Sequence, residues 1–174
     1  MAQNYKSILK NINTLIFDVD GVFTDNRVIL IPGMEPVRTF SARDGYALQY
    51  AIKKGLRLVI ITGGRSESVI DRLKEFGIEH IYTSIQNKEE KLDAFIKETS
   101  IDPEKILYMG DDIPDLRVML KVGLACCPQD AVNEIKNICN YVSPIKGGHG
   151  CVRDIIEQTL KVQGKWMEED AHEW

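Results

Sequence analysis

Short apolar runs alternate with segments of helical periodicity along the whole chain. The apolar runs predict strands at 15–17, 56–61, 80–82, 106–109, 123–126 and 141–142. Apolar positions three or four residues apart predict helices at 4–11, 44–54, 66–76, 87–96, 114–120, 131–138 and 152–162. Alternating strands and helices are typical of a parallel sheet with helices on both faces. The sequence therefore predicts a Rossmann-like α/β fold.

Several residues mark where the predicted helices begin and end. Gly55 and Gly77 follow the last apolar positions of two helices and predict their C-terminal ends. Ser66 is a candidate N-cap, and Asn87 followed by Glu90 resembles a capping box. Pro114 suits the first turn of a helix, because its missing N–H has no partner there in any case.

The segment between the first strand and the first long helix predicts a projecting flap. Two short extended runs, 27–31 and 37–40, flank the segment 32–36, which contains two prolines and a glycine. This pattern predicts a β-hairpin spanning about 26–41.

Length predicts a single domain, since 174 residues can bury one core but leave no room for a large second domain. We place this domain at 1–164. The remaining residues, 165–174, are rich in acidic side chains, and we expect a flexible tail there. Docking of Trp166 and Trp174 on a neighbour is the alternative.

Charge and hydropathy limit the possible partners. The net charge is −4 and the basic residues are scattered, so nucleic acid is not an expected partner. No apolar run approaches the roughly 18 residues that cross a bilayer, and residues 1–10 lack the pattern of a signal peptide. The four cysteines have no CxxC spacing, so we expect buried thiols rather than zinc or disulfides. A cytoplasmic protein is the default.

Polar residues of one chemical kind follow several predicted strands. Asp18 and Asp20 follow the first strand, Thr62 follows the second, and Asp111 follows the fourth. Because ligands of such sheets bind beyond the carboxyl ends of the strands, these side chains are expected to meet. Each stretch taken alone is equally compatible with an acidic turn or a helix cap.

Clustered carboxylates need a cation, because like charges in close proximity repel. Mg²⁺ prefers carboxylate oxygens together with water and substrate phosphate. Asp18 and Asp111 are the expected side-chain ligands, although Mn²⁺ and Co²⁺ stay open as alternatives.

The motifs DxDGVxxD at 18–25, ITG at 61–63, a following lysine and GDDxxD at 110–115 resemble those of the haloacid dehalogenase-like phosphatases. The resemblance implies that Asp18 is the nucleophile and forms an aspartyl-phosphate. It implies that Asp20 acts as acid and base beside the substrate and adds its backbone carbonyl to the metal ligands. Thr62 and Gly63 would hold the phosphoryl oxygens.

The lysine of this motif set is either Lys88 or Lys91. The spacing to Asp111 favours Lys88, which would contact both the nucleophile and the substrate phosphate. Asp115 is expected to support the metal ligands or the metal-bound waters, and Asp112 is the alternative as second metal contact. A non-catalytic phosphoryl-binding regulator of the receiver type is the alternative class, although its acceptor aspartate lies mid-chain.

No cap domain fits between Asp25 and Asp44 or after Thr62. The hairpin, FSARDGY at 40–46 and GGHGCVRD at 147–154 resemble the capless 3-deoxy-D-manno-octulosonate 8-phosphate phosphatases of lipopolysaccharide synthesis. That resemblance implies a homotetramer in which the hairpin and a neighbouring C-terminal segment close each site. It also implies that Ser41, Arg43, Asp44 and Gly45 contact the sugar acid. We add Arg72, on the predicted helix after Thr62, because its guanidinium could bind a carboxylate or hydroxyl groups.

Two positions depart from that group. Gly64 stands where an arginine follows Thr-Gly, although Arg65 is adjacent, and His149 replaces an arginine of the glycine-rich segment. A phosphatase of nine-carbon, sialic-acid-type 9-phosphates would share nearly all the remaining features, and it is the alternative within the same class.

Overall fold

The computed structural model describes residues 4–173 and contains a six-stranded, entirely parallel sheet. The strands, in the spatial order β3-β2-β1-β4-β5-β6, confirm the predicted α/β fold. Their bounds are β1 Thr14–Phe17, β2 Arg57–Ile61, β3 His80–Tyr82, β4 Ile106–Met109, β5 Leu124–Cys127 and β6 Tyr141–Val142.

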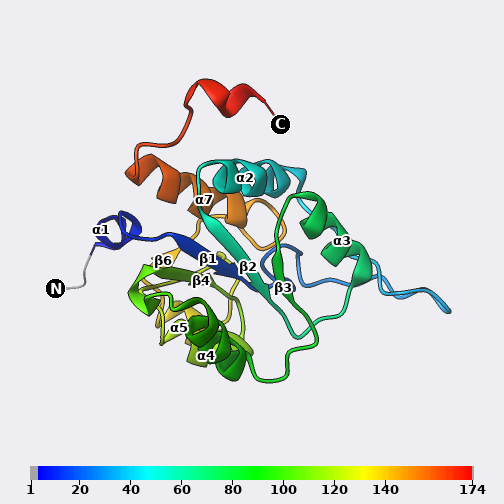
Figure 1. Ribbon diagram of the computed structural model, residues 1–174. Helices are drawn as coiled ribbons and strands as arrows, with labels where there is room; N and C mark the ends of the chain where they lie inside the picture. Colours follow the sequence, from blue (N-terminus) through cyan, green and yellow to red (C-terminus); the bar gives the residue numbers. More distant parts are fainter. Residues whose placement is uncertain (1–3, 174) are drawn as a thin grey trace.

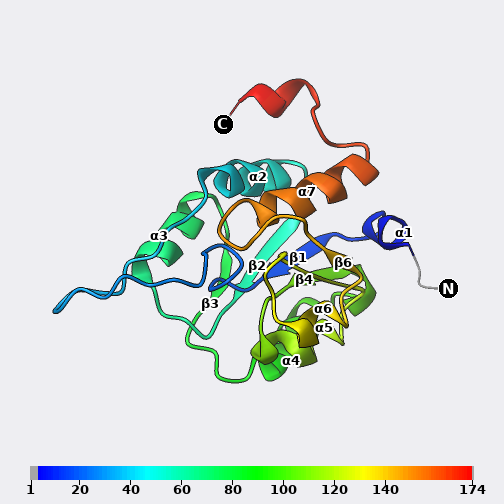
Figure 2. The ribbon, with the colours of Figure 1, turned by 180° about the vertical axis from the view of Figure 1, so that it is seen from behind.

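Helices cover both faces of this sheet (Figures 1 and 2). On one face lie α2 (Ala42–Lys53) and α7 (Cys151–Val162), and on the other lie α4 (Lys88–Thr99), α5 (Leu116–Met119) and α6 (Asn133–Lys136). The shorter elements are α1 Tyr5–Leu9, α3 Glu67–Glu75, η1 Pro103–Lys105, η2 Ile113–Asp115 and η3 Glu169–His172.

Alternating side chains of the strands form two separate cores. In β1, Leu15 and Phe17 pack toward α2 and α7, whereas Ile16 packs toward α4 and α5. All three side chains are fully buried. A central parallel strand therefore has no polar face, which explains its continuous apolar run.

The helix ends agree with most of the sequence signals. The Asn87 side chain accepts hydrogen bonds from the N–H groups of Glu89 and Glu90, as the capping box predicts. Ser66 occupies the N-cap of α3, but its side chain makes no capping hydrogen bond there; its hydroxyl lies 3.2 Å from that of Ser68.

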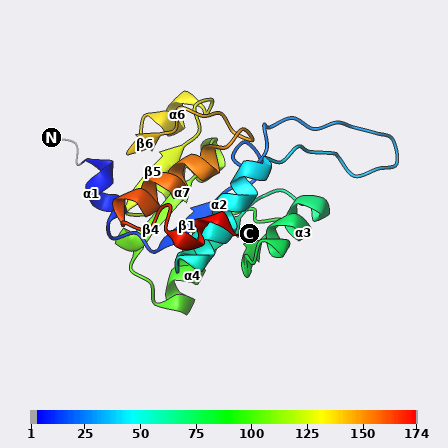
Figure 3. The ribbon, with the colours of Figure 1, turned by 90° about the horizontal axis from the view of Figure 1, so that it is seen from above.

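Residues 26–41 project from the domain beside α3 (Figure 3). Their two arms share one antiparallel bridge, between Ile29 and Val37, and neither arm is long enough to count as a strand. An arm with a single paired position and no third strand gains little from sheet formation, which explains the difference from the expected β-hairpin.

The C-terminal segment 165–173, where we expected a flexible tail, lies against α2 (Figure 1). The Trp166 ring packs edge-on against Tyr50 at 5.5 Å, and Lys54 pairs with Glu168 and Asp170. These contacts hold the acidic residues, because the basic end of α2 offers cations to them. Trp174 and residues 1–3 lie outside the described residues.

No helix among residues 4–173 is long and apolar enough to cross a bilayer.

Candidate active site

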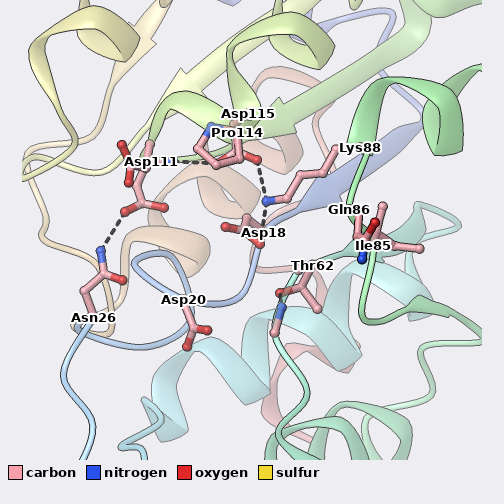
Figure 4. Close-up of a pocket in the computed structure, with 13 residues that line it drawn as sticks. Asp18, Asp20, Asn26, Thr62, Ile85, Gln86, Lys88, Asp111, Pro114 and Asp115 are labelled. Carbon is pink, nitrogen blue, oxygen red and sulfur yellow. Dashed lines mark hydrogen bonds and ion pairs between the residues drawn. The ribbon is translucent and has the colours of Figure 1, made fainter.

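A pocket of about 300 Å³ opens beyond the carboxyl ends of β1, β2 and β4 (Figure 4). The strand order reverses at β1, with β2 on one side and β4 on the other, and such a reversal leaves a crevice at the sheet edge. The residues lining the pocket are Asp18, Asp20, Asn26, Thr62, Gly63, Gly64, Ile85, Gln86, Lys88, Asp111, Asp112, Pro114 and Asp115.

Asp18 and Asp111 come together because β1 and β4 are paired in register. Phe17 lies opposite Met109, and the backbone N–H of Asp18 donates to the Met109 carbonyl at 3.0 Å. Carboxylate oxygens of Asp18, Asp111 and Asp115 lie within 4.8 Å of one another, and all three residues are buried.

Gly21 leaves the space that Asp111 occupies. A Cβ atom on Gly21 would lie 2.0 Å from Asp111 Oδ2, and the φ angle of +83° disfavours any other residue. Asn26, at the base of the flap, donates to the same Oδ2 at 2.7 Å. The DxDG turn therefore forms one wall of the acidic cluster.

Lys88, at the start of α4, is the cation inside the cluster. Its Nζ lies 2.9 Å from Asp18 Oδ1 and 2.7 Å from Asp115 Oδ1. Lys91 instead places its ammonium 3.4 Å from the centre of the Tyr82 ring. Of the two candidate lysines, Lys88 is the one that contacts the expected nucleophile.

Burial and mutual repulsion raise the pKa values of two of the carboxyl groups. Burial, with the Asp115 charge, raises the pKa of Asp18 to about 6 although Lys88 opposes the shift. Burial, together with Asp18 and Asp115, raises the pKa of Asp111 to about 7. The ionised cluster is therefore unfavourable without further positive charge.

The cluster fits a hard divalent cation. Asp18 Oδ1 is buried and receives no well-angled hydrogen bond, even though Lys88 is close enough to form an ion pair. Asp115 is already engaged by Lys88, by the Tyr108 hydroxyl at 2.8 Å and by the Asp111 N–H at 3.2 Å. Asp18 and Asp111 thus have oxygens to offer an ion, while Asp115 orients the groups around it.

We predict that the metal-free protein loses stability as the pH rises from about 4 to 7. Asp18 and Asp111 have folded-state pKa values above their ordinary 3.8, so the folded protein holds more protons than the unfolded chain in this window. Asp44, whose pKa burial raises to about 7, acts in the same direction.

Thermal unfolding in EDTA should therefore give a lower Tm at pH 8 than at pH 5. Saturating Mg²⁺ should stabilise the protein more at pH 8, because the cation binds the ionised carboxylates. A metal-free Tm that rises steadily across this range would contradict the prediction.

Asp20 and Thr62 lie at the mouth of the pocket (Figure 4). Thr62 is almost fully buried, and its hydroxyl accepts a hydrogen bond from the Gly64 N–H at 3.0 Å. Gly63 is exposed and lines the pocket beside it. Asp20 is paired with Arg38 of the flap, whose Nε lies 2.7 Å from Asp20 Oδ1.

Arg38 and Asn26 are functional candidates that sequence reasoning missed. Both belong to the flap, which carries no recognisable motif, and each contacts an acidic residue far away along the chain. The signal that could have pointed to Arg38 is Gly64, which stands where the phosphatases that this sequence resembles have an arginine. The absence of that arginine suggests that another segment supplies a basic group to the pocket.

Several residues expected at the substrate do not line the pocket. Asp44 is fully buried, and its Oδ1 accepts the Arg153 N–H at 2.7 Å at the start of α7. Gly45 is buried against Phe76, where an added Cβ would lie 2.4 Å from the ring. Asp44 therefore connects α2 to α7, and Gly45 allows α2 to pack closely against Phe76 at the end of α3.

The remaining expected contacts are exposed or partly exposed. Arg72 pairs with Glu75 at 2.7 Å, Ser41 is the N-cap of α2, and Arg43 lines a second hollow together with His149. Asp112 caps the Ile113 N–H and is exposed at the pocket rim.

Comparison with known proteins agrees with this geometry. A model of the haloacid dehalogenase-like hydrolases matches residues 45–127. The 3-deoxy-D-manno-octulosonate 8-phosphate phosphatase of Escherichia coli K12 is 37% identical over 156 residues, covering 90% of this chain and 83% of that protein. The chain belongs to the haloacid dehalogenase-like hydrolases.

Solved structures of this hydrolase family resemble the chain over nearly its whole length. The 3-deoxy-D-manno-octulosonate 8-phosphate phosphatase from Yersinia pestis is 34% identical, with a TM-score of 0.90, covering 95% of this chain and 89% of that one. The enzyme from Moraxella catarrhalis, solved with magnesium, phosphate and KDO, is 31% identical, with a TM-score of 0.89 and 92% of each chain covered.

Proposed function

We propose that this hydrolase removes the phosphate of 3-deoxy-D-manno-octulosonate 8-phosphate, with Mg²⁺ as cofactor, in lipopolysaccharide biosynthesis. The observation that carries the proposal is the buried cluster of Asp18, Asp111, Asp115 and Lys88 in a pocket at the sheet edge. Relatives and structural neighbours that bear this activity in their names support the substrate.

Asp18 acts as the nucleophile in this proposal. Its carboxylate oxygen attacks phosphorus, the bond to the sugar oxygen breaks, and Asp20 donates a proton to the leaving alkoxide. Water then attacks phosphorus, Asp20 accepts its proton, and the Asp18 carboxylate leaves. Thr62 and the Gly63 N–H hold phosphoryl oxygens, and Lys88 neutralises the nucleophile before attack.

Asp18, Asp111 and the Asp20 carbonyl would hold Mg²⁺. The ion supplies positive charge that lets an anionic substrate approach a site rich in carboxylates.

The decisive experiment is a phosphate-release panel with Mg²⁺, comparing the eight-carbon sugar acid 8-phosphate with nine-carbon 9-phosphates. We expect kcat/KM for the eight-carbon compound to exceed the others by at least about tenfold, a difference of roughly 1.4 kcal/mol in transition-state binding. A tenfold preference for a nine-carbon compound would reject the named substrate. Inertness toward every compound would favour a phosphoryl-binding regulator.

We also propose that four copies assemble through the flap. Apolar side chains on this segment are exposed to solvent, at 42–74% for Val28, Ile29, Leu30, Ile31 and Met34. Large apolar side chains that are exposed together on one short segment are typical of an interface. An open pocket without a cap domain would be completed by a neighbouring chain.

Leu30→Glu should split the assembly. Light scattering should give about 79 kDa for the wild type, four times the chain mass of 19.7 kDa, and a smaller species for the variant. A charged substitution away from the flap, Ala94→Glu on α4, should leave the mass unchanged. A monomeric wild type at micromolar concentration would contradict the prediction.

A cytoplasmic location belongs to the same proposal. The four cysteines are free thiols, as expected for a protein that stays in a reducing compartment.

A further inference from the structure

The second arm of the flap, residues 35–40, is attached to the domain at both of its ends. At one end Glu35 Oε1 accepts the Glu67 N–H of the first turn of α3 at 2.9 Å. At the other end the Phe40 ring stacks between Phe23, at 5.6 Å, and Phe76, at 5.9 Å. Because both ends are anchored, this arm holds its middle residues at the mouth of the pocket.

Arg38 lies between these anchors and contacts both oxygens of Asp20. The Nε to Oδ1 distance is 2.7 Å and the Nη2 to Oδ2 distance is 3.4 Å, while Nη1 donates to the Pro36 carbonyl. The Arg38 side chain is 13% exposed, so its guanidinium is held inside the structure. A planar guanidinium that contacts two carboxylate oxygens fixes the rotation of the carboxylate as well as its position.

Gly64 leaves room beside the Asp20 carboxylate. A Cβ atom at position 64 would lie 2.9 Å from Asp20 Oδ2 and 3.3 Å from Thr62 Oγ1. A larger residue there would press on the same carboxylate oxygen that Arg38 contacts. The absence of a side chain at position 64 therefore lets the Asp20 carboxylate keep the orientation in which it contacts Arg38.

We propose that Arg38 is a positioning residue that acts through Asp20, holding its carboxylate in the orientation needed for proton transfer. The proposal rests on the role given to Asp20 in the proposed function. Arg38 contacts Asp20 and is not assigned a contact with substrate. Proton transfer is sensitive to such orientation, because small displacements of a catalytic group slow the reaction strongly.

Four variants test this role: Arg38→Met, Arg38→Lys, Asp20→Asn and the double variant of Arg38→Met with Asp20→Asn. kcat and KM are measured with Mg²⁺ for p-nitrophenyl phosphate and for the sugar-acid phosphate. Arg38→Met should lower kcat by about 10- to 100-fold on both substrates with KM changed less than about threefold. Arg38→Lys should recover part of kcat, since its ammonium keeps the charge but not the two-point contact.

The Asp20→Asn background separates an indirect role from a direct one. If Arg38 acts through Asp20, adding Arg38→Met to Asp20→Asn should lower kcat by less than about twofold further, because residues acting as a unit are not additive. Arg117→Met, an exposed arginine on α5 whose side chain is 79% exposed, serves as the matched control. Circular dichroism and Tm of each variant confirm that it is folded.

Three results would overturn the role of Arg38. One is a rise in KM for the sugar-acid phosphate alone with kcat preserved, which would make Arg38 a substrate ligand. Another is an equal loss of kcat from Arg38→Met with and without Asp20, and the third is an unchanged kcat in folded Arg38→Met. A wild type inactive toward both substrates would instead reject the proposed function, and the role of Arg38 with it.

Discussion

Asp18→Asn should abolish phosphate release, with kcat reduced by at least about 10⁴-fold, as for other enzymes that lose their nucleophile. The amide is nearly isosteric with the carboxylate but cannot attack phosphorus. Steady-state assays with Mg²⁺ and either substrate measure the effect. The same charge removal at the surface, Asp71→Asn on α3, should leave kcat unchanged, because Asp71 pairs with Lys74 on its own helix.

Stability separates this result from simple unfolding. Burial and Asp115 raise the Asp18 pKa from 3.8 to about 6, so its ionised form disfavours the folded state at neutral pH. Metal-free Asp18→Asn should therefore be more stable than the wild type at pH 8, by up to about 2 kcal/mol. An inactive variant that is also destabilised would leave the nucleophile unproven, and an active variant would reject it.

Lys88→Met should destabilise the protein far more than Lys91→Met. Its removal leaves Asp18 and Asp115 buried without their cation, and breaking such a buried pair costs about 3–5 kcal/mol. Urea unfolding in EDTA at pH 7 measures the loss. Mg²⁺ should offset part of it, since the ion supplies positive charge to the same cluster. In Mg²⁺, kcat should fall by at least about 100-fold.

Lys91→Met is the matched control, because the two lysines lie one turn apart on α4. Lys91 contacts the face of Tyr82, and loss of such a contact costs about 0.5–1 kcal/mol. Its kcat should stay near that of the wild type. Equal effects of the two substitutions, or a larger effect at Lys91, would show that Lys88 is not the cation of the site.

The strand and helix positions were predictable because each depends on local patterning. β2 is apolar and buried from Leu58 to Ile61, and β4 is buried from Ile106 to Met109, as parallel strands in the middle of a sheet require. Asn87 with Glu90 marked the start of α4. The flap was less predictable. Its sequence has strand-like residues, but pairing also needs a partner, and the structure provides one bridge.

The acidic cluster was predictable for a different reason. Residues that follow parallel strands share one edge of the sheet, so the sequence alone predicts that Asp18, Thr62 and Asp111 lie together. Residues on helices and loops lack this constraint. Asp44 and Gly45 were expected at the substrate and are instead buried at the contacts of α2 with its neighbours.

By itself, the sequence determined the order of strands and helices, the end of the sheet that carries the chemistry and the choice of carboxylates, because all three follow from spacing along one chain. Tertiary structure alone decided that Lys88 contacts Asp115 as well as the expected Asp18, that Arg38 reaches Asp20, and that the C-terminal segment rests on α2. Each of these contacts joins segments distant in sequence. Their geometry depends on how the flap and helices pack, which no local pattern encodes.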